Sequence, residues 1–283
     1  MIVHRGKTIE EVIELLAKYK DSKIIAGGTD VILDIKDNKI FPEALIDISS
    51  IEELKGIELK GDFIEIGAGT TFTEIAEDEI FEKNLHGLKK ACKLIGSPQI
   101  RNRGTVGGNI VNGSPAADSI PPLLCLESTL IFESLEGIRK VKLEDYLKSK
   151  YRIKEHELLT KIRFKNPEGL LNFIKLAIRK ALAISRMSIA TLIELDEEEK
   201  VKDIKVASGS LGRYPMRELE VEEFLLGTIL GEYTVDEAVN ILQNAMEKRL
   251  KGRPTLPYKK RAVKSLLKEA LNQRIRSSRR VIS

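Results

Sequence analysis

Two loops with paired glycines constrain the fold of this chain more than any other feature. The first is Ala26-Gly27-Gly28-Thr29-Asp30, which directly follows a short apolar run that reads as a strand. The second runs from Gly104 to Ile110. Paired glycines let the backbone adopt positive φ and approach a ligand closely, and successive N–H groups can surround a phosphate. Either loop alone is also compatible with a simple turn, but two together suit a ligand with two phosphates, such as a dinucleotide.

The loops do not follow the common nucleotide-binding motifs. A Rossmann loop requires GxGxxG, and Gly67-Ala68-Gly69 is followed by Thr-Thr-Phe, which lacks the third glycine. A P-loop requires GxxxxGK[ST], and no stretch of the chain contains that complete motif. We therefore expect any bound dinucleotide to lie on a different fold.

The first half of the chain reads as α/β. Thr8-Ile9-Glu10-Glu11 has the spacing of a capping box that opens a helix. Alternating residues on either side of a Gly-Asp pair predict a hairpin over 57–66. A helix is expected over about 79–95, and another begins after Asp118. Between them, Gly96–Pro115 is rich in Gly, Asn, Ser and Pro, and such long loops are often functional.

The pattern changes near residue 168. Strands are predicted at about 171–178, 186–195 and 201–207, followed by helices at about 218–226, 234–249 and 258–273. A run of strands followed by a run of helices indicates a separate α+β domain. A length of 283 residues suits two domains. We therefore expect a ligand-binding domain over 1–168, with subdomains of about 1–55 and 56–168, a C-terminal domain over 169–275 and a basic tail over 276–283.

Few residues are candidates for other chemistry. Cys92 and Cys125 share no CxxC spacing and are too few for an iron–sulfur cluster, so both are expected to be ordinary buried residues. The three histidines (His4, His86 and His156) are scattered without metal-ligand spacing, and no serine has a GxSxG setting. We therefore predict no metal site and assign no catalytic residue.

Location and charge add two expectations. The chain starts without a secretion signal and contains no apolar run of about 18 residues, so a cytoplasmic protein with no membrane span is expected. The net charge is +4, and the basic residues gather toward the C-terminus. No aromatic residue interleaves this basic segment, so we favour a solvated helix face or contact with an acidic partner over nucleic-acid binding.

The two loops and their surroundings resemble the FAD-binding medium subunit of the xanthine dehydrogenase and carbon monoxide dehydrogenase family of molybdenum hydroxylases. The resemblance rests on Ala26–Asp30 and on Thr105–Ile110 with Ser114-Pro115 and Asp118 downstream. It extends over nearly the whole chain, through Ile66–Thr71, Lys175–Arg179 and, more weakly, the last helices. It implies an α+β fold: a two-subdomain FAD-binding domain of the vanillyl-alcohol oxidase/PCMH type, not Rossmann, and a smaller C-terminal α+β domain with a three-stranded sheet and helices.

The resemblance also implies a set of cofactor-binding residues. Residues Ile24 to Val31 would surround the FAD pyrophosphate, while Thr105, Gly108, Asn109 and Asp118 would hold the phosphates and the ribityl chain. Ile95 would pack on the cofactor, and Leu159 and Lys175 would reach the flavin end. A cation near the flavin N1 tunes its electronics, so Lys175 is expected to stabilise negative charge on the reduced ring. The predicted set is Ile24, Ile25, Ala26, Gly27, Gly28, Thr29, Asp30, Val31, Ile95, Thr105, Gly108, Asn109, Asp118, Leu159 and Lys175.

The function implied by the resemblance is that of an FAD-carrying subunit in a hetero-oligomer. The chain has neither a molybdenum-cofactor segment nor the cysteines of a cluster domain, so an iron–sulfur subunit and a molybdenum-cofactor subunit would be separate chains. This subunit would take electrons from the former and pass them to NAD+ or another acceptor. A stand-alone flavoprotein oxidoreductase and a non-catalytic nucleotide-binding assembly module remain alternatives.

Overall fold

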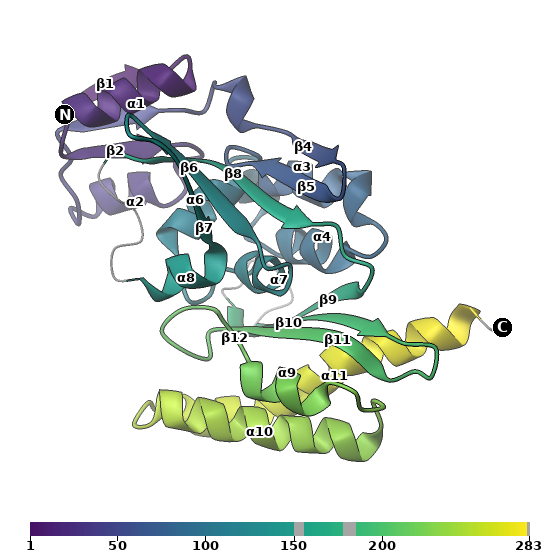
Figure 1. Cartoon of the computed structure of the whole chain (residues 1–283). Helices are drawn as coiled ribbons and strands as arrows, with labels where there is room; N and C mark the ends of the chain where they lie inside the picture. Colours follow the sequence, from purple (N-terminus) through teal and green to yellow (C-terminus); the bar gives the residue numbers. More distant parts are fainter. Residues whose placement is uncertain (150–155, 178–184, 282–283) are drawn as a thin grey trace. The chain divides into compact units, whose positions relative to one another are not determined.

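The computed structural model describes the backbone of residues 1–149, 156–177 and 185–281, and side chains as far as residue 272. Contacts divide the chain into two compact units (Figure 1). The first unit comprises Met1–Glu77, Gly96–Asn112 and Glu127–Asn166. The second comprises Asp78–Ile95, Gly113–Leu126 and Pro167–Ser283. Each unit is therefore built from several separate stretches of the sequence.

The first unit begins with a small parallel sheet. Its strands are β1 (Ile2–Arg5), β3 (Ala44–Asp47) and β2 (Ser22–Ile25), in the order β1-β3-β2. Helix α1 (Ile9–Lys18) buries Val12, Ile13 and Leu16. The predicted cap is present in part: the Thr8 side chain accepts from the Glu11 N–H, while the Glu11 carboxylate accepts from the N–H of Lys7 rather than that of Thr8. Helix α2 (Val31–Lys36) follows the first glycine loop.

A five-stranded antiparallel sheet completes the first unit. Its order is β4-β5-β8-β6-β7, formed by β4 (Ile57–Lys60), β5 (Phe63–Gly67), β8 (Leu158–Lys165), β6 (Thr129–Ser134) and β7 (Gly137–Lys142). The predicted hairpin over 57–66 is the β4–β5 pair, and Gly61 takes the positive φ that its turn requires. The short helices of this unit are η1 (Glu52–Leu54), α3 (Phe72–Glu77), α5 (Pro98–Arg101), α6 (Val106–Asn112) and α8 (Leu143–Lys148).

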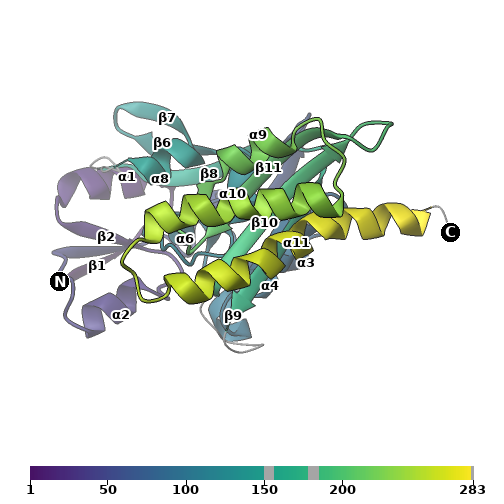
Figure 2. The ribbon, with the colours of Figure 1, turned by 90° about the horizontal axis from the view of Figure 1, so that it is seen from below.

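The second unit is built on one antiparallel sheet with helices. Its order is β12-β11-β10-β9, formed by β9 (Leu170–Ala177), β10 (Ser185–Leu195), β11 (Val201–Gly209) and β12 (Met216–Arg217). The helices are η2 (Glu79–Phe81), α4 (His86–Lys93), α7 (Ile120–Cys125), α9 (Leu219–Leu225), α10 (Glu232–Leu250) and α11 (Leu256–Val281). Helices α10 and α11 pack together (Figure 2), and Asp236 of α10 forms an ion pair with Lys268 of α11. Apolar residues from the sheet and these helices form one core.

The sequence missed several short elements. The three predicted C-terminal strands are present, and the two-residue β12 adds a fourth. The glycine-rich stretch Gly96–Pro115 contains α5 and α6, and the helix expected over 79–95 is divided into η2 and α4. These pieces span at most eight residues, which is too short for a clear periodic pattern. Among the described helices, none is long and apolar enough to cross a membrane.

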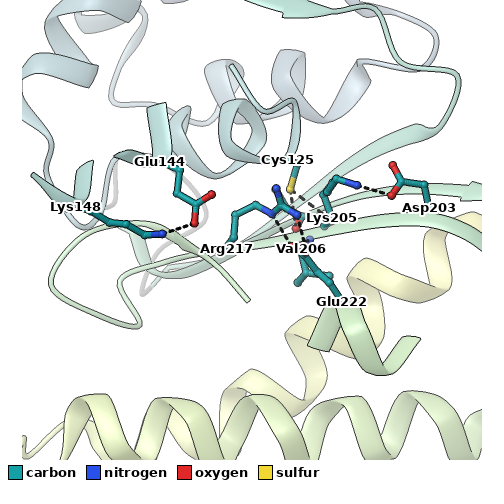
Figure 3. Close-up of polar contacts among 9 residues, drawn as sticks. Cys125, Glu144, Lys148, Asp203, Lys205, Val206, Arg217 and Glu222 are labelled. Carbon is teal, nitrogen blue, oxygen red and sulfur yellow. Dashed lines mark hydrogen bonds and ion pairs between the residues drawn. The ribbon is translucent and has the colours of Figure 1, made fainter. Parts of the chain in front are cut away.

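Buried polar groups link the sheet of the second unit to its helices. Arg217 donates to Glu222, whose Oε1 also accepts from the N–H of Val206 at 2.8 Å (Figure 3). The Cys125 thiol of α7 donates to the Ala190 carbonyl at 3.4 Å. Both Cys92 and Cys125 are buried free thiols, as the sequence predicts. Burial raises the pKa of each thiol.

We expect both thiols to resist alkylation in the folded protein. The thiolate is the reactive form, and burial removes both the charge and the access that the reaction needs. Titration with a chromogenic disulfide should detect essentially no thiol at neutral pH and two per chain in denaturant. Rapid modification of either cysteine in the native state would contradict the packing of α4 or α7.

Candidate functional site

A cavity of about 350 Å³ lies in the first unit, beside the glycine loops. Drug-sized ligands occupy cavities of this order. Both loops and the start of β8 contribute to its wall. The lining residues from the predicted set are Ile24, Ala26, Gly27, Gly28, Thr29, Asp30, Val31, Thr105, Gly108, Asn109 and Leu159. Ile25 does not line the cavity; its carbonyl accepts from the N–H of Ile48, and its side chain lies against Gly28.

The first loop lines this cavity and carries unused backbone donors. Its N–H groups from Gly27 to Asp30 donate to none of the residues that the structure describes. Asp30, the N-cap of α2, makes no side-chain capping bond, and Gly28 has a φ of 72°. A run of free backbone N–H groups at such a turn is the arrangement that binds phosphate oxygens.

The second loop is different, because its N–H groups are already used. Val106 and Gly107 donate to the carbonyls of Thr70 and Ala68 at 3.0 and 2.9 Å. Gly108 donates to the Thr105 hydroxyl at 3.1 Å. This loop therefore offers the cavity side chains and close backbone approach rather than a second cradle of free N–H groups.

Glycine permits the two loops to meet. A Cβ on Gly27 would lie 1.9 Å from the Arg103 carbonyl oxygen, at the start of the second loop, and a Cβ on Gly107 would lie 2.6 Å from that of Ala68. Both positions are therefore closed to any larger residue. Gly108 faces the cavity, and a Cβ there would approach nothing within 4 Å except the Thr105 hydroxyl at 3.0 Å. In the second pair, Gly108 thus keeps open the space that a ligand would occupy.

Three predicted residues belong to the second unit, where two of them form an ion pair. Lys175 Nζ on β9 lies 2.6 Å from Asp118 Oδ2 and 3.0 Å from the Leu94 carbonyl oxygen. The two side chains are 7% and 5% exposed. The bond to Leu94 places Ile95, the next residue along the chain, near this pair.

The Asp118 carboxylate is only partly satisfied by the residues that the structure describes. Burial raises the pKa of Asp118, while the positive charge of Lys175 acts in the opposite direction. Its other oxygen, Oδ1, is buried and makes no hydrogen bond of normal geometry within the described part of the chain, although the Ser185 hydroxyl, which is unsatisfied as well, is close enough to lower the pKa of Asp118. A buried carboxylate oxygen without a partner is costly, which is typical of a position that receives a ligand hydroxyl or water.

Sequence reasoning missed several residues of the cavity wall. Glu157 and Leu158 precede the predicted Leu159, while Phe72 and Ala68 come from the segment after β5; Lys23, Asp34 and Ile40 flank the first loop. The one sequence signal at Glu157 is an acidic residue directly before the apolar pair Leu158-Leu159. The others have no signature, because packing alone brings them to the cavity.

Comparison with known proteins shows the family to which this sequence is similar. Residues 1–166 match the family described as the FAD binding domain in molybdopterin dehydrogenase, and residues 172–274 match the CO dehydrogenase flavoprotein C-terminal domain. The chain is 35% identical to the nicotinate dehydrogenase FAD-subunit of Eubacterium barkeri, over 93% of this chain and 92% of that one. It is 30% identical to the xanthine dehydrogenase FAD-binding subunit of Escherichia coli O157:H7, over 96% and 95%.

Solved structures agree. A carbon monoxide dehydrogenase from Hydrogenophaga pseudoflava matches with a TM-score of 0.89 at 29% identity, covering 96% of both chains. This chain therefore belongs to the FAD-binding medium subunits of the xanthine dehydrogenase and carbon monoxide dehydrogenase family of molybdenum hydroxylases. It is a flavin-dependent oxidoreductase subunit whose cofactor is FAD. The free N–H groups of the first loop, the open space at Gly108 and the unsatisfied Asp118 Oδ1 fit that cofactor.

We expect Lys175→Met to destabilise the second unit by about 3 kcal/mol, because it leaves Asp118 buried without its cation. The double variant Lys175→Met/Asp118→Asn should recover much of this loss, since it removes both charges. Urea unfolding of the three proteins measures the effect. Equal stability of Lys175→Met and wild type would mean that the ion pair does not form.

The loss in Lys175→Met should also depend on pH. Without Lys175, burial acts on Asp118 against only the smaller effect of the Ser185 hydroxyl among the described residues, so the folded-state pKa of Asp118 rises further above the ordinary value of 3.8. The folded state then binds more protons than the unfolded state between these two pKa values, so stability falls as the pH rises through that window. Unfolding curves at acidic and neutral pH should show a larger difference from wild type at neutral pH. A difference that shrinks on going to neutral pH would contradict this assignment.

Proposed function

We propose that this chain is the electron-transfer subunit of a molybdenum hydroxylase complex. Its FAD would receive electrons from an iron–sulfur subunit and pass them to NAD+ or another acceptor. The proposal is supported by the family and by relatives whose names describe FAD subunits and medium chains of dehydrogenases. The observation that carries it in this chain is the row of free N–H groups from Gly27 to Asp30, beside the cavity.

The residues of the first unit would bind the dinucleotide part of the cofactor. The N–H groups of Gly27 to Asp30 would bind the pyrophosphate, and the open space at Gly108 would accommodate it. Apolar residues such as Ile24, Ile40 and Leu159 line the same cavity and would exclude water from the bound group. We also propose that the FAD-binding domain ends near residue 168, with the C-terminal domain over 169–275.

The Asp118–Lys175 pair is our candidate for the group that tunes the flavin. FAD supplies the electron-carrying chemistry when it is bound, and nearby charge sets its electronics. Lys175 holds its ammonium group between Asp118 and the Leu94 carbonyl, so the position of this charge is fixed before any ligand arrives. We propose that Lys175 stabilises negative charge on the reduced ring, and that Asp118 both orients Lys175 and offers Oδ1 to the cofactor.

Partner chains would supply the remaining redox centres. Two cysteines cannot supply the four thiolates of an iron–sulfur cluster. Affinity purification of the tagged chain from its native cells, followed by measurement of molybdenum, iron, sulfide and FAD, tests this assembly. Stoichiometric metals and flavin in one particle support the proposal. FAD-loaded chain that purifies alone under gentle conditions would instead favour a stand-alone flavoprotein.

The acceptor is tested separately on the same particle. Anaerobic addition of NADH should bleach the flavin absorbance if NAD+ is the acceptor, since the reaction between FAD and NAD(H) runs in both directions. An unchanged flavin spectrum, with bleaching by dithionite as a control, would exclude NAD+ and point to another acceptor.

We expect Gly108→Val to abolish retention of FAD while leaving the fold intact. The added side chain enters the cavity, where its neighbour is the Thr105 hydroxyl rather than backbone. Gly231→Val is a matched control, because Gly231 is exposed, has an extended backbone and meets nothing closer than 3.9 Å. Flavin absorbance per chain measures the result, with circular dichroism as a check of folding. Full FAD content in folded Gly108→Val would show that the second loop does not approach the cofactor.

A further inference from the structure

An acidic side chain in the wall of the cavity forms an ion pair with an arginine. Glu157 lines the cavity immediately before β8 and is 6% exposed. Arg139 of β7 binds both of its carboxylate oxygens: Nε to Oε1 at 2.7 Å and Nη2 to Oε2 at 2.6 Å. Such a bidentate pair is the strong form of the interaction, because the planar guanidinium matches the carboxylate.

The sheet holds Arg139 in place for this contact. Arg139 lies opposite Phe132 of β6 in the strand register, and Phe132 in turn lies opposite Leu159 of β8. The Arg139 guanidinium lies 4.6 Å from the centroid of the Phe132 ring, which stabilises it through a cation–π contact. Arg139 does not itself line the cavity. It therefore acts on the cavity through Glu157.

The charges around the cavity explain why this pair matters. The described residues that line it include three acids, Asp30, Asp34 and Glu157, and one cation, Lys23. Asp30 and Asp34 are at the surface, and Asp34 also pairs with Lys39. Water and salt screen such exposed charges. Glu157 is buried, so its charge would act at greater strength on a ligand in the cavity.

We propose that Arg139 is a positioning residue that neutralises Glu157, so that a cavity with an acidic wall can accept the negatively charged pyrophosphate of FAD. The inference rests on FAD occupying this cavity. Glu157 directly precedes β8, so the pair also ties the start of this strand to β7. The wall is irregular at this point: the β6–β8 register shifts between Ile131 and Phe132, and Thr160 donates to the Ile131 carbonyl. A second restraint comes from His156, whose ring Nδ1 contacts the Leu16 carbonyl at 2.5 Å.

Variants that change the charge of Arg139 or Glu157 can show whether Arg139 neutralises Glu157 or only holds the cavity wall in place. Arg139→Met keeps an aliphatic stem on Phe132 but leaves the Glu157 carboxylate without the guanidinium. We expect the affinity of the purified chain for FAD to fall on the order of tenfold, the effect of losing one positive charge beside a buried carboxylate. Glu157→Gln leaves Arg139 as an excess positive charge, so FAD should bind as tightly as to wild type or more tightly. Arg139→Met/Glu157→Gln should restore wild-type affinity within about threefold.

A matched control is available in the same sheet. Arg163 of β8 stacks on Phe63 at 4.2 Å and lies 3.7 Å from Glu65, and it does not line the cavity. Arg163→Met therefore makes the same chemical change at an arginine on an aromatic ring, away from the ligand. Its affinity for FAD should match that of wild type. Thermal melting of all variants checks that they fold.

The pH dependence of FAD affinity gives a readout that bracing alone would not change. Among the residues that the structure describes, the charged and titratable groups facing Glu157 or sharing its cavity are Arg139, His156, Lys23, Asp30 and Asp34. In Arg139→Met, protonation of Glu157 at acidic pH removes the repulsion, so the affinity should rise as the pH falls. The double variant Arg139→Met/Glu157→Gln lacks this carboxyl and should lose that pH dependence while keeping any contributed by the other groups.

The outcomes are distinct. FAD titrations followed by fluorescence quenching measure all five proteins. If wild type binds no FAD at all, the assignment of the cavity fails and this inference fails with it. If wild type binds FAD but Arg139→Met/Glu157→Gln stays as weak as Arg139→Met, or Glu157→Gln alone is equally weak, the pair is a brace and the neutralisation proposal is overturned. Unchanged affinity in folded Arg139→Met overturns it as well.

Discussion

The contact between the two glycine loops is the constraint on which the cavity depends. Gly27 and the segment Arg103–Gly104 approach so closely that a Cβ would overlap the Arg103 carbonyl. The first loop follows β2 of the small parallel sheet. The second loop is hydrogen-bonded through Val106 and Gly107 to the segment after β5. The two sheets of the first unit are thus joined at the point where the cavity forms. A larger residue at Gly27 would separate them before it affected any ligand.

The sequence identified the loops but could not distinguish the roles of their glycines. Each loop contains a Gly-Gly pair, and both were expected to offer N–H groups to phosphate. Within the part of the chain that the structure describes, the N–H groups of the first loop have no acceptor, whereas those of Val106, Gly107 and Gly108 in the second loop are hydrogen-bonded. The difference arises because the second loop opens α6, where Thr105 caps the helix, whereas α2 begins at Asp30 without a side-chain cap. Local pattern cannot reveal which donors tertiary contacts will consume.

Long-range pairs set the limit of what could be predicted. Asp118 and Lys175 were proposed through family resemblance, yet their 57-residue separation gives no periodic signal that they meet. Arg139 and Glu157 were not singled out, because they are brought together by the pairing of β7, β6 and β8 and not by spacing along one element. The strands of the C-terminal sheet, the β4–β5 hairpin and the longer helices were predicted, since alternation and helical spacing are local properties, whereas β1, β6, β7 and β8 were not. The site combines such local elements with contacts that only the assembled sheet creates.

Buried charge is handled in the same way in both units. Lys175–Asp118 and Arg139–Glu157 each keep a buried carboxylate beside a cation, and each lies next to residues proposed to hold the cofactor. The two pairs differ in how many oxygens of the carboxylate bind the cation. Arg139 occupies both oxygens of Glu157, which leaves that carboxylate little capacity to bind a ligand, whereas Lys175 occupies one oxygen of Asp118 and leaves Oδ1 without a described partner. Since an unsatisfied buried acceptor is costly, the first arrangement suits a wall whose charge must be hidden, and the second suits a group that completes its hydrogen bonds when the cofactor binds.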